Sequence, residues 1–222
     1  MERHLDQDLE DLKKLLLKMG ILVEAAVFEA TEALKELNSK RANAVVSGDK
    51  AIDEWENTVD EKCLDLLALQ QPMAGDLRFI TMSMKISTDL ERMADLAVDI
   101  AQRVIELSDK PLLKPLIDIP KLTKLAQQMS KNALDAFVNR DADLAGRAIL
   151  LDREADRLRN LVQKELIEEY MSKDPSTVSR AVPLLLIARH LERICDHATN
   201  IAEDVIYMVQ AKVVRHHPEQ LK

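Results

Sequence analysis

The chain has 222 residues, a net charge of −8 and 47% hydrophobic residues, but only 3% aromatic residues and four glycines. Proteins that bind nucleic acid or anionic lipid usually carry a basic surface, so the acidic balance argues against both functions. The scarcity of aromatic residues and glycines argues against a sheet fold, whereas the abundance of Leu, Ala, Glu and Lys favours helices. The composition therefore predicts an all-α bundle.

Apolar residues recur at helical spacing through the first half of the chain. Pro72 and Gly75 interrupt this pattern and should end one helix before the next begins. The segment 108–120 contains three prolines and therefore predicts a connector between two halves of the molecule. The expected helices of the first half, with ends good to about three residues, cover 5–38, 40–70 and 76–108.

The second half shows the same helical pattern after the proline-rich connector. Asp174 and Pro175 should separate its last two helices, and Pro183 is expected to kink or delay the final one. The expected helices of this half cover 117–139, 141–171 and 176–212, within the same margin of about three residues.

The two halves resemble each other in sequence. Segment 89–104 (DLERMADLAVDIAQRV) aligns without a gap to segment 190–205 (HLERICDHATNIAEDV) with eight identities. Upstream, segment 48–53 (GDKAID) pairs with segment 151–156 (LDREAD) in the same order. We therefore expect two tandem three-helix bundles related by an internal repeat, one formed by residues 1–113 and the other by residues 114–222.

Acidic residues fall on the apolar face of the second and third helices. A helix advances about 100° per residue, which places Glu91 within about 40° of Ile80 and Met84, with Asp95 at the edge of the same arc. On the preceding helix, four acids at i, i+4, i+7 and i+11 run down an otherwise apolar stripe. These four are Asp49, Asp53, Glu56 and Asp60.

The second half repeats this arrangement and then departs from it. Glu192 lies in the apolar arc of the last helix and Asp196 lies at its edge. The fifth helix keeps two acids, Asp152 and Asp156, but has Arg159 where the first half has Glu56.

Ionised carboxylates that face a core cost several kcal/mol each unless a cation compensates them. The compensating charge is either a metal ion or basic residues elsewhere in a solvated groove, and the spacing alone leaves both open. Arg92 and Arg193 point about 100° away from the neighbouring glutamates, so we expect them to be poor partners within their own helices. Clusters of carboxylates alone suit Mg, Ca, Mn or Fe ions.

The histidines do not complete a metal site in the sequence pattern. His190 and His197 fall on the polar face of the last helix, where we expect them to be solvated. The sequence contains no Glu-x-x-His pair, which disfavours a ferritin-type di-iron site. It also lacks a Gly-rich phosphate loop, a nucleophile elbow and any Ser/His/Asp grouping, so we expect no enzymatic activity.

Two features of the chain predict a cytoplasmic protein. Cys63 and Cys195 do not occupy matching positions and belong to no Cys-x-x-Cys pair, so we expect them to be reduced. The N-terminus carries charges of both signs without an apolar core, unlike a signal peptide, and the longest apolar stretch, 182–188, is far too short to span a membrane.

Segment 70–101 (QQPMAGDLRFITMSMKISTDLERMADLAVDIA) resembles the signature of the PhoU family, bacterial regulators of phosphate uptake, and segment 188–205 resembles its duplicate. The resemblance covers nearly the whole chain. It implies metal clusters, of iron or of other divalent or trivalent ions, held by acidic motifs on the helix faces. By position, the first cluster would use Asp49, Asp53, Glu91, Asp95 and Asp99, and the second would use Asp152, Asp156, Glu192, Asp196 and Asn200.

The resemblance also implies a function. The protein would be a homodimeric, non-enzymatic negative regulator of the phosphate-starvation response. It would act as an adaptor between the ATPase subunit of the phosphate ABC transporter and the sensor histidine kinase PhoR, and would reach the inner face of the membrane only through these partners. An alternative from a different class is a carboxylate-bridged metal-binding bundle with a storage or enzymatic role.

Overall fold

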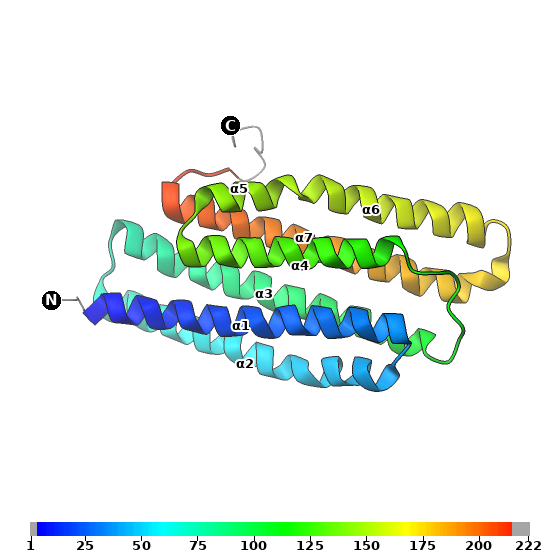
Figure 1. The fold of residues 1–222 in the computed structure, drawn as a ribbon. Coiled ribbons are helices and arrows are strands. Elements are labelled where there is room, and N and C mark those ends of the chain that lie inside the picture. Colours follow the sequence, from blue (N-terminus) through cyan, green and yellow to red (C-terminus); the bar gives the residue numbers. More distant parts are fainter. Residues whose placement is uncertain (1–3, 215–222) are drawn as a thin grey trace.

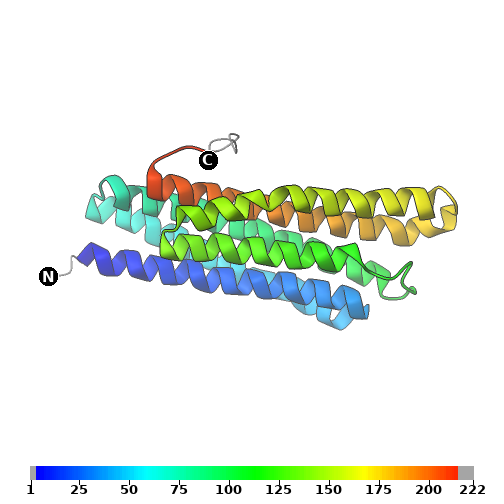
Figure 2. The same cartoon turned by 45° about the horizontal axis from the view of Figure 1, so that its top comes forward.

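A computed structural model describes residues 4–214, which form helices and connecting turns without any strand (Figure 1). Long helices lie side by side along one axis and give the molecule an elongated shape (Figures 1 and 2). The elements are α1 (His4–Glu36), α2 (Ser39–Gln70), α3 (Ala74–Leu107), α4 (Asp118–Asn139), α5 (Ala142–Leu150), α6 (Asp152–Glu165), the π-helix η1 (Leu166–Met171), the 3₁₀ turn η2 (Pro175–Thr177) and α7 (Val178–Gln210).

The helices form two three-helix units, as the internal repeat predicts. The first unit contains α1, α2 and α3, and the second contains α4, the α5–α6 arm and α7 (Figure 2). The two units join mainly through α3 and α7, which run antiparallel. Arg78 Nε near the start of α3 donates to the carbonyl of Met208 near the end of α7 at 3.2 Å. The ends of α1 to α4 and of α7 agree with the expected ends within three residues.

One predicted helix, 141–171, is not continuous in the structure. The chain leaves regular α-helical geometry at Leu151, whose N–H donates to the carbonyl of Ala148 at 3.1 Å, three residues back. The helix resumes at Asp152 and widens into the π-helix η1 at Leu166. Neither change occurs at a proline or glycine, so the sequence offered no local signal for them.

Pro183 does not delay the start of the last helix, so this part of the expectation that it would kink or delay the helix was wrong. Helix α7 begins at Val178 and passes through Pro183, which is buried. Proline has no N–H to donate to the carbonyl of Ser179, four residues earlier. Lys110 Nζ, from the connector between the halves, donates to that carbonyl at 3.3 Å. A side chain distant in sequence therefore satisfies the carbonyl that the proline leaves free.

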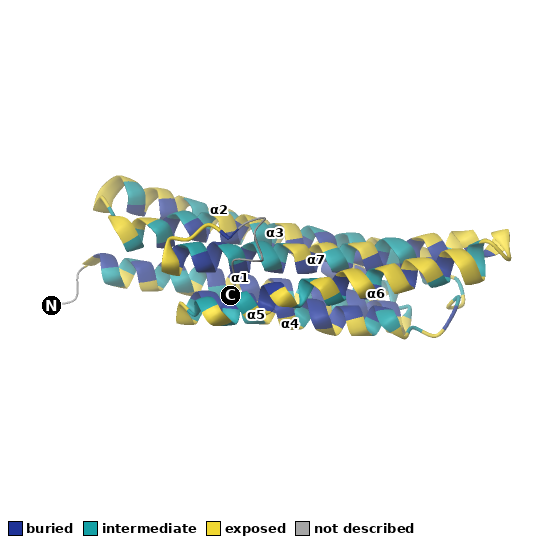
Figure 3. Cartoon of the chain, turned by 90° about the horizontal axis from the view of Figure 1, so that it is seen from above, coloured by how far each residue is buried: buried dark blue, intermediate teal, exposed yellow. Residues whose placement is uncertain are grey.

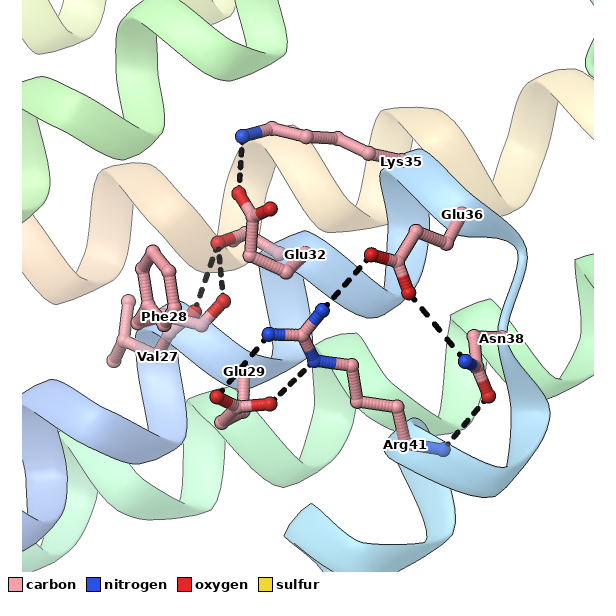
Figure 4. Close-up of polar contacts among 9 residues, drawn as sticks. Val27, Phe28, Glu29, Glu32, Lys35, Glu36, Asn38 and Arg41 are labelled. Atoms are coloured by element: carbon pink, nitrogen blue, oxygen red, sulfur yellow. Dashed lines mark hydrogen bonds and ion pairs between the residues drawn. The ribbon is translucent and has the colours of Figure 1, made fainter.

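The corner between α1 and α2 is held by polar contacts (Figure 4). The side chain of Asn38 accepts a hydrogen bond from the backbone N–H of Arg41 at 3.0 Å and caps α2. The Arg41 guanidinium contacts Glu36 Oε1 at 3.0 Å and Glu29 Oε1 at 3.2 Å on α1. Four residues thus fix the angle at which α2 leaves α1.

The buried residues form one core that runs through both halves, whereas exposed residues cover the outer faces of the helices (Figure 3). Small side chains let the helices approach closely. At Gly20 on α1, an added Cβ would lie 2.6 Å from Leu134 Cδ1 on α4. No helix within residues 4–214 has an apolar stretch long enough to cross a membrane.

Candidate functional site

The N-terminal acidic cluster lies where α2 and α3 pack together. It consists of Asp49, Asp53 and Glu56 on α2 and Glu91 and Asp95 on α3. The acids of α2 are four and three residues apart, and those of α3 are four residues apart, so each set lies on one side of its helix. The neighbouring carboxylates are close enough to raise the pKa values of Asp49 and Glu91, because Asp53 and Asp95 act on Asp49, and Asp95, Glu56 and Asp53 act on Glu91.

Partial burial of this cluster makes its negative charges costly. The Glu91 side chain is only 16% exposed, and desolvation, followed by repulsion from Asp95, raises its pKa to about 7. Desolvation is also the main cause that raises the pKa of Asp49. Asp49 Oδ1 is buried and has no hydrogen-bond partner. A buried carboxylate oxygen without a partner is unfavourable unless a cation or donor reaches it.

The residues that do contact this cluster, Thr88 and Arg92, lie at its solvent-exposed edge. Thr88 Oγ1 donates to Glu56 Oε1 at 3.1 Å. Arg92 lies 3.4 Å from Glu91 Oε2 and 3.1 Å from Asp95 Oδ2, so the expectation that Arg92 would be a poor partner was wrong. The long arginine side chain can reach back over the surface of its own helix. It is 56% exposed, so solvent weakens these ion pairs.

The C-terminal acidic cluster repeats this arrangement in the other half. It consists of Asp152 and Asp156 on α6 and Glu192 and Asp196 on α7. Desolvation, followed by repulsion from Glu192 and Asp152, raises the pKa of Asp196 to about 6. The pKa of Asp152 is also raised, first by desolvation and then by Asp156 and Glu192. All four acids therefore lie together, as the repeat predicts.

An arginine joins the C-terminal cluster from the position that Glu56 holds in the first half. Arg159 Nη2 lies 3.2 Å from Asp156 Oδ1 and 3.1 Å from Glu192 Oε1, and its side chain is only 28% exposed. The guanidinium therefore connects an acid on α6 with an acid on α7. It borders a cavity of about 570 Å³ whose other lining residues are Gln163, Leu185, Arg189, Glu192, Arg193 and Asp196.

Two residues assigned to the clusters by resemblance have polar contacts with the opposite half of the molecule. Asp99 on α3 is 3.7 Å from His190 Nδ1 on α7. Asn200 Nδ2 on α7 donates to Asp89 Oδ1 on α3 at 3.2 Å. Both residues therefore contribute to the contact between the halves.

The histidines of α7 belong to the same contact between the halves. The side chains of His190 and His197 are 15% and 18% exposed, and His197 Nδ1 lies 2.8 Å from Asp89 Oδ1. The expectation that these histidines would be solvated was wrong, because helix periodicity within α7 cannot reveal that α3 covers this face.

The donor chemistry of the N-terminal cluster fits a hard cation. Its ligands would be carboxylate oxygens, and Asp49 supplies a buried oxygen that no protein group satisfies. Among residues 4–214, however, no three Asp, Glu, His or Cys side chains converge into a ready-made metal site. An ion would therefore have to draw these side chains together. The C-terminal cluster already contains Arg159 between its acids and fits a metal ion less well.

Comparison with known proteins places this geometry in a family. A family model described as the PhoU domain matches residues 16–104 and 119–205. A phosphate-specific transport system accessory protein PhoU homolog from Aquifex aeolicus is 40% identical over 210 residues, covering 95% of each chain. The crystal structure of PhoU from Pseudomonas aeruginosa matches with a TM-score of 0.90 at 39% identity, over 93% of this chain and 99% of that chain.

A second solved structure agrees with the first. The crystal structure of the phosphate transport system regulatory protein PhoU from Streptococcus pneumoniae matches with a TM-score of 0.89 at 30% identity, over 95% of this chain and 99% of that chain. Both copies of the domain and nearly the full length of the relatives are therefore present. The chain belongs to the PhoU family.

Proposed function

We propose that this protein is a regulatory accessory protein of phosphate transport and acts by binding other proteins and not by catalysis. The observation that carries the proposal is similarity along the whole chain. The Aquifex aeolicus relative, named an accessory protein of the phosphate-specific transport system, matches over 95% of both chains. The Streptococcus pneumoniae structure, titled a regulatory protein, covers 95% of this chain.

In its finer form, the proposal is that a cytoplasmic homodimer connects the ATPase subunit of the phosphate transporter with the sensor kinase PhoR at the inner face of the membrane. Exposed apolar side chains at the α2–α3 corner support docking onto protein partners. Leu69 and Met73 are 77% and 79% exposed there. Large apolar side chains that gather at a surface mark interaction sites more often than isolated ones do.

Cross-linking and purification of the tagged protein from cells grown in high phosphate test this docking. We expect the transporter ATPase and the sensor kinase to be recovered with the wild-type chain and lost with a Leu69→Asp/Met73→Asp variant. A Glu61→Lys variant, which changes charge on an exposed face of α2, is the matched control and should retain both partners. Recovery of neither partner with the wild type would contradict the adaptor role.

We further propose that a divalent or trivalent metal ion, iron included, binds between α2 and α3. Asp49, Asp53, Glu91 and Asp95 would hold it. A bound ion would supply the positive charge that these carboxylates lack. The support is the unpartnered Asp49 Oδ1 together with five acids that, among the residues the structure describes, contact a single arginine, Arg92, which is 56% exposed.

Elemental analysis of protein purified without chelator tests the metal proposal. The wild type should contain metal that a Glu91→Ala/Asp95→Ala variant lacks. Equal metal content in the two proteins would contradict the proposed site.

A further inference from the structure

We propose that the two acidic clusters have diverged, so that a metal ion binds only in the N-terminal half while Arg159 is the resident cation of the C-terminal half. This inference rests on the metal proposal for the first half. It departs from the expectation, implied by family resemblance, that both halves hold metal. The contacts of Arg159 and the replacement of residues around it carry the inference.

Arg159 occupies the place between helices where a bridging cation would act. Its Nη2 atom contacts Asp156 Oδ1 on its own helix at 3.2 Å and Glu192 Oε1 on α7 at 3.1 Å. Glu192 is 15% exposed and Arg159 is 28% exposed, so the pair is largely shielded from water. A guanidinium keeps its charge at any physiological pH and presents its donors in a fixed plane. It therefore supplies a permanent positive charge to two of the four acids, Asp156 and Glu192, whereas a metal ion can leave.

The equivalent position in the first half carries the opposite charge. The repeat aligns Glu56 with Arg159, and Glu56 adds a fifth acid to the N-terminal cluster. Within residues 4–214, Arg92 is the one arginine that contacts this cluster, and it is 56% exposed and pairs from the exposed edge. The N-terminal cluster therefore has a greater need for an external cation than its counterpart.

Other replacements around the C-terminal cavity also reduce the negative charge there. Gln163 stands where the first half has Asp60, and Arg189 stands where it has Thr88. Arg189 and Arg193 both line the cavity of about 570 Å³ beside Glu192 and Asp196. Three arginines thus surround two acids in this cavity. Counted with Asp152 and Asp156, the cluster has four acids against three arginines, so an approaching cation meets much less negative charge here than in the first half, where the equivalent residues include a single arginine.

The stability of metal-free protein tests the role of Arg159 without any ion. In excess EDTA, Arg159→Gln should lower the melting temperature by about 3 °C or more, since it leaves the shielded Glu192 without its cationic partner. The matched change at the equivalent position, Glu56→Gln, should leave the melting temperature unchanged or raise it. Equal losses from both substitutions, or no loss from Arg159→Gln, would overturn the assignment of Arg159 as the internal cation.

Titration with Mn²⁺, followed by the electron paramagnetic resonance signal of the free ion, tests which half binds metal. Binding should disappear in Glu91→Ala/Asp95→Ala and persist in Asp152→Ala/Asp196→Ala. Arg159→Glu should add bound Mn²⁺ that the Asp152→Ala/Asp196→Ala changes remove. The reverse pattern, with binding lost only when the C-terminal acids are changed, would overturn the inference.

The titration also separates this inference from the metal proposal itself. If the wild type binds no Mn²⁺ but Arg159→Glu does, the metal proposal for the first half fails while the blocking role of Arg159 stands. If the wild type binds Mn²⁺ and Arg159→Glu adds none, the metal proposal stands and the blocking role fails.

Discussion

Glu91 and Glu192 occupy equivalent positions in the two repeats but have different charged neighbours. Their side chains are 16% and 15% exposed, and each lies beside an aspartate four residues later. Glu91 meets further acids from α2, whereas Glu192 meets the guanidinium of Arg159 from α6. The sequence could predict both acidic clusters, because helical spacing places the acids on the packed faces. It could not predict that Arg159 reaches Glu192, since that contact depends on how two helices pack.

Replacement of Glu91 by glutamine should stabilise the metal-free protein at alkaline pH. The pKa of Glu91 is raised from 4.5 to about 7, so between these values the folded state binds the proton more tightly than the unfolded state. The free energy of unfolding therefore falls as pH rises through this range. Urea unfolding in EDTA should show a gain for Glu91→Gln of about 1 kcal/mol at pH 8, reduced by solvent screening, and almost none at pH 4. An equal effect at both pH values would contradict this origin.

The two thiols should be unreactive in the folded protein. Cys63 and Cys195 are completely buried, and burial raises the pKa of the Cys63 thiol to about 12. The thiolate, which is the reactive form, is therefore scarce at pH 8. Ellman's reagent should label neither thiol within minutes in native buffer and both thiols in guanidinium chloride. Rapid labelling of the native protein would show that the helices around these residues open readily.

At the scale of single elements, helix ends follow sequence signals more faithfully than helix interiors do. Asn38 caps α2 and Asp141 caps α5, each through its side-chain oxygen. The prolines and Gly75 that interrupt the helical pattern explain why the expected ends lie within three residues of the observed ones. The irregular turn at Leu151 and the π-helix η1 carry no such signal, since their residues are ordinary helix formers. Packing against α7 and α4, which no local pattern encodes, surrounds this arm.

Loss of the Asp141 cap should weaken the α5 arm. Its Oδ1 atom accepts hydrogen bonds from the backbone N–H groups of Asp143 and Leu144 at 3.0 and 2.9 Å. Asp141→Ala should lower the free energy of unfolding by about 1 kcal/mol, measured by urea denaturation. Asp143→Ala removes a neighbouring, exposed acid without removing the cap and should cost much less. Equal costs for the two variants would show that charge and not capping matters at this end.

At the scale of the whole molecule, the contact between α3 and α7 makes one body of two similar halves. Apolar residues bury most of this contact, and polar pairs from both helices line its edges, among them Lys85 with Asp204 and Asp99 with His190. Family resemblance assigned Asp99 to the metal ligands and helix periodicity placed the α7 histidines in solvent, and neither takes account of the facing helix. The division into residues 1–113 and 114–222 stays a prediction.

Asp89 should stabilise the packing of α3 against α7, which joins the two halves. Its Oδ1 atom contacts His197 Nδ1 at 2.8 Å and accepts a hydrogen bond from Asn200 Nδ2 at 3.2 Å. Asp89→Ala leaves both partners half-buried without an acceptor and should lower the free energy of unfolding by about 1–2 kcal/mol. Calorimetry or urea denaturation would measure this loss. The control is Asp109→Ala at an exposed turn, where a loss of the same size would contradict a specific role for Asp89.

Expression of phosphate-starvation genes in cells that lack this protein tests its proposed regulatory function most directly. A reporter for those genes should be active in the deletion strain even when phosphate is plentiful, and re-expression of the full chain should silence it. A reporter that stays silent in high phosphate after the deletion, and still responds normally to starvation, would contradict a role in restraining the response.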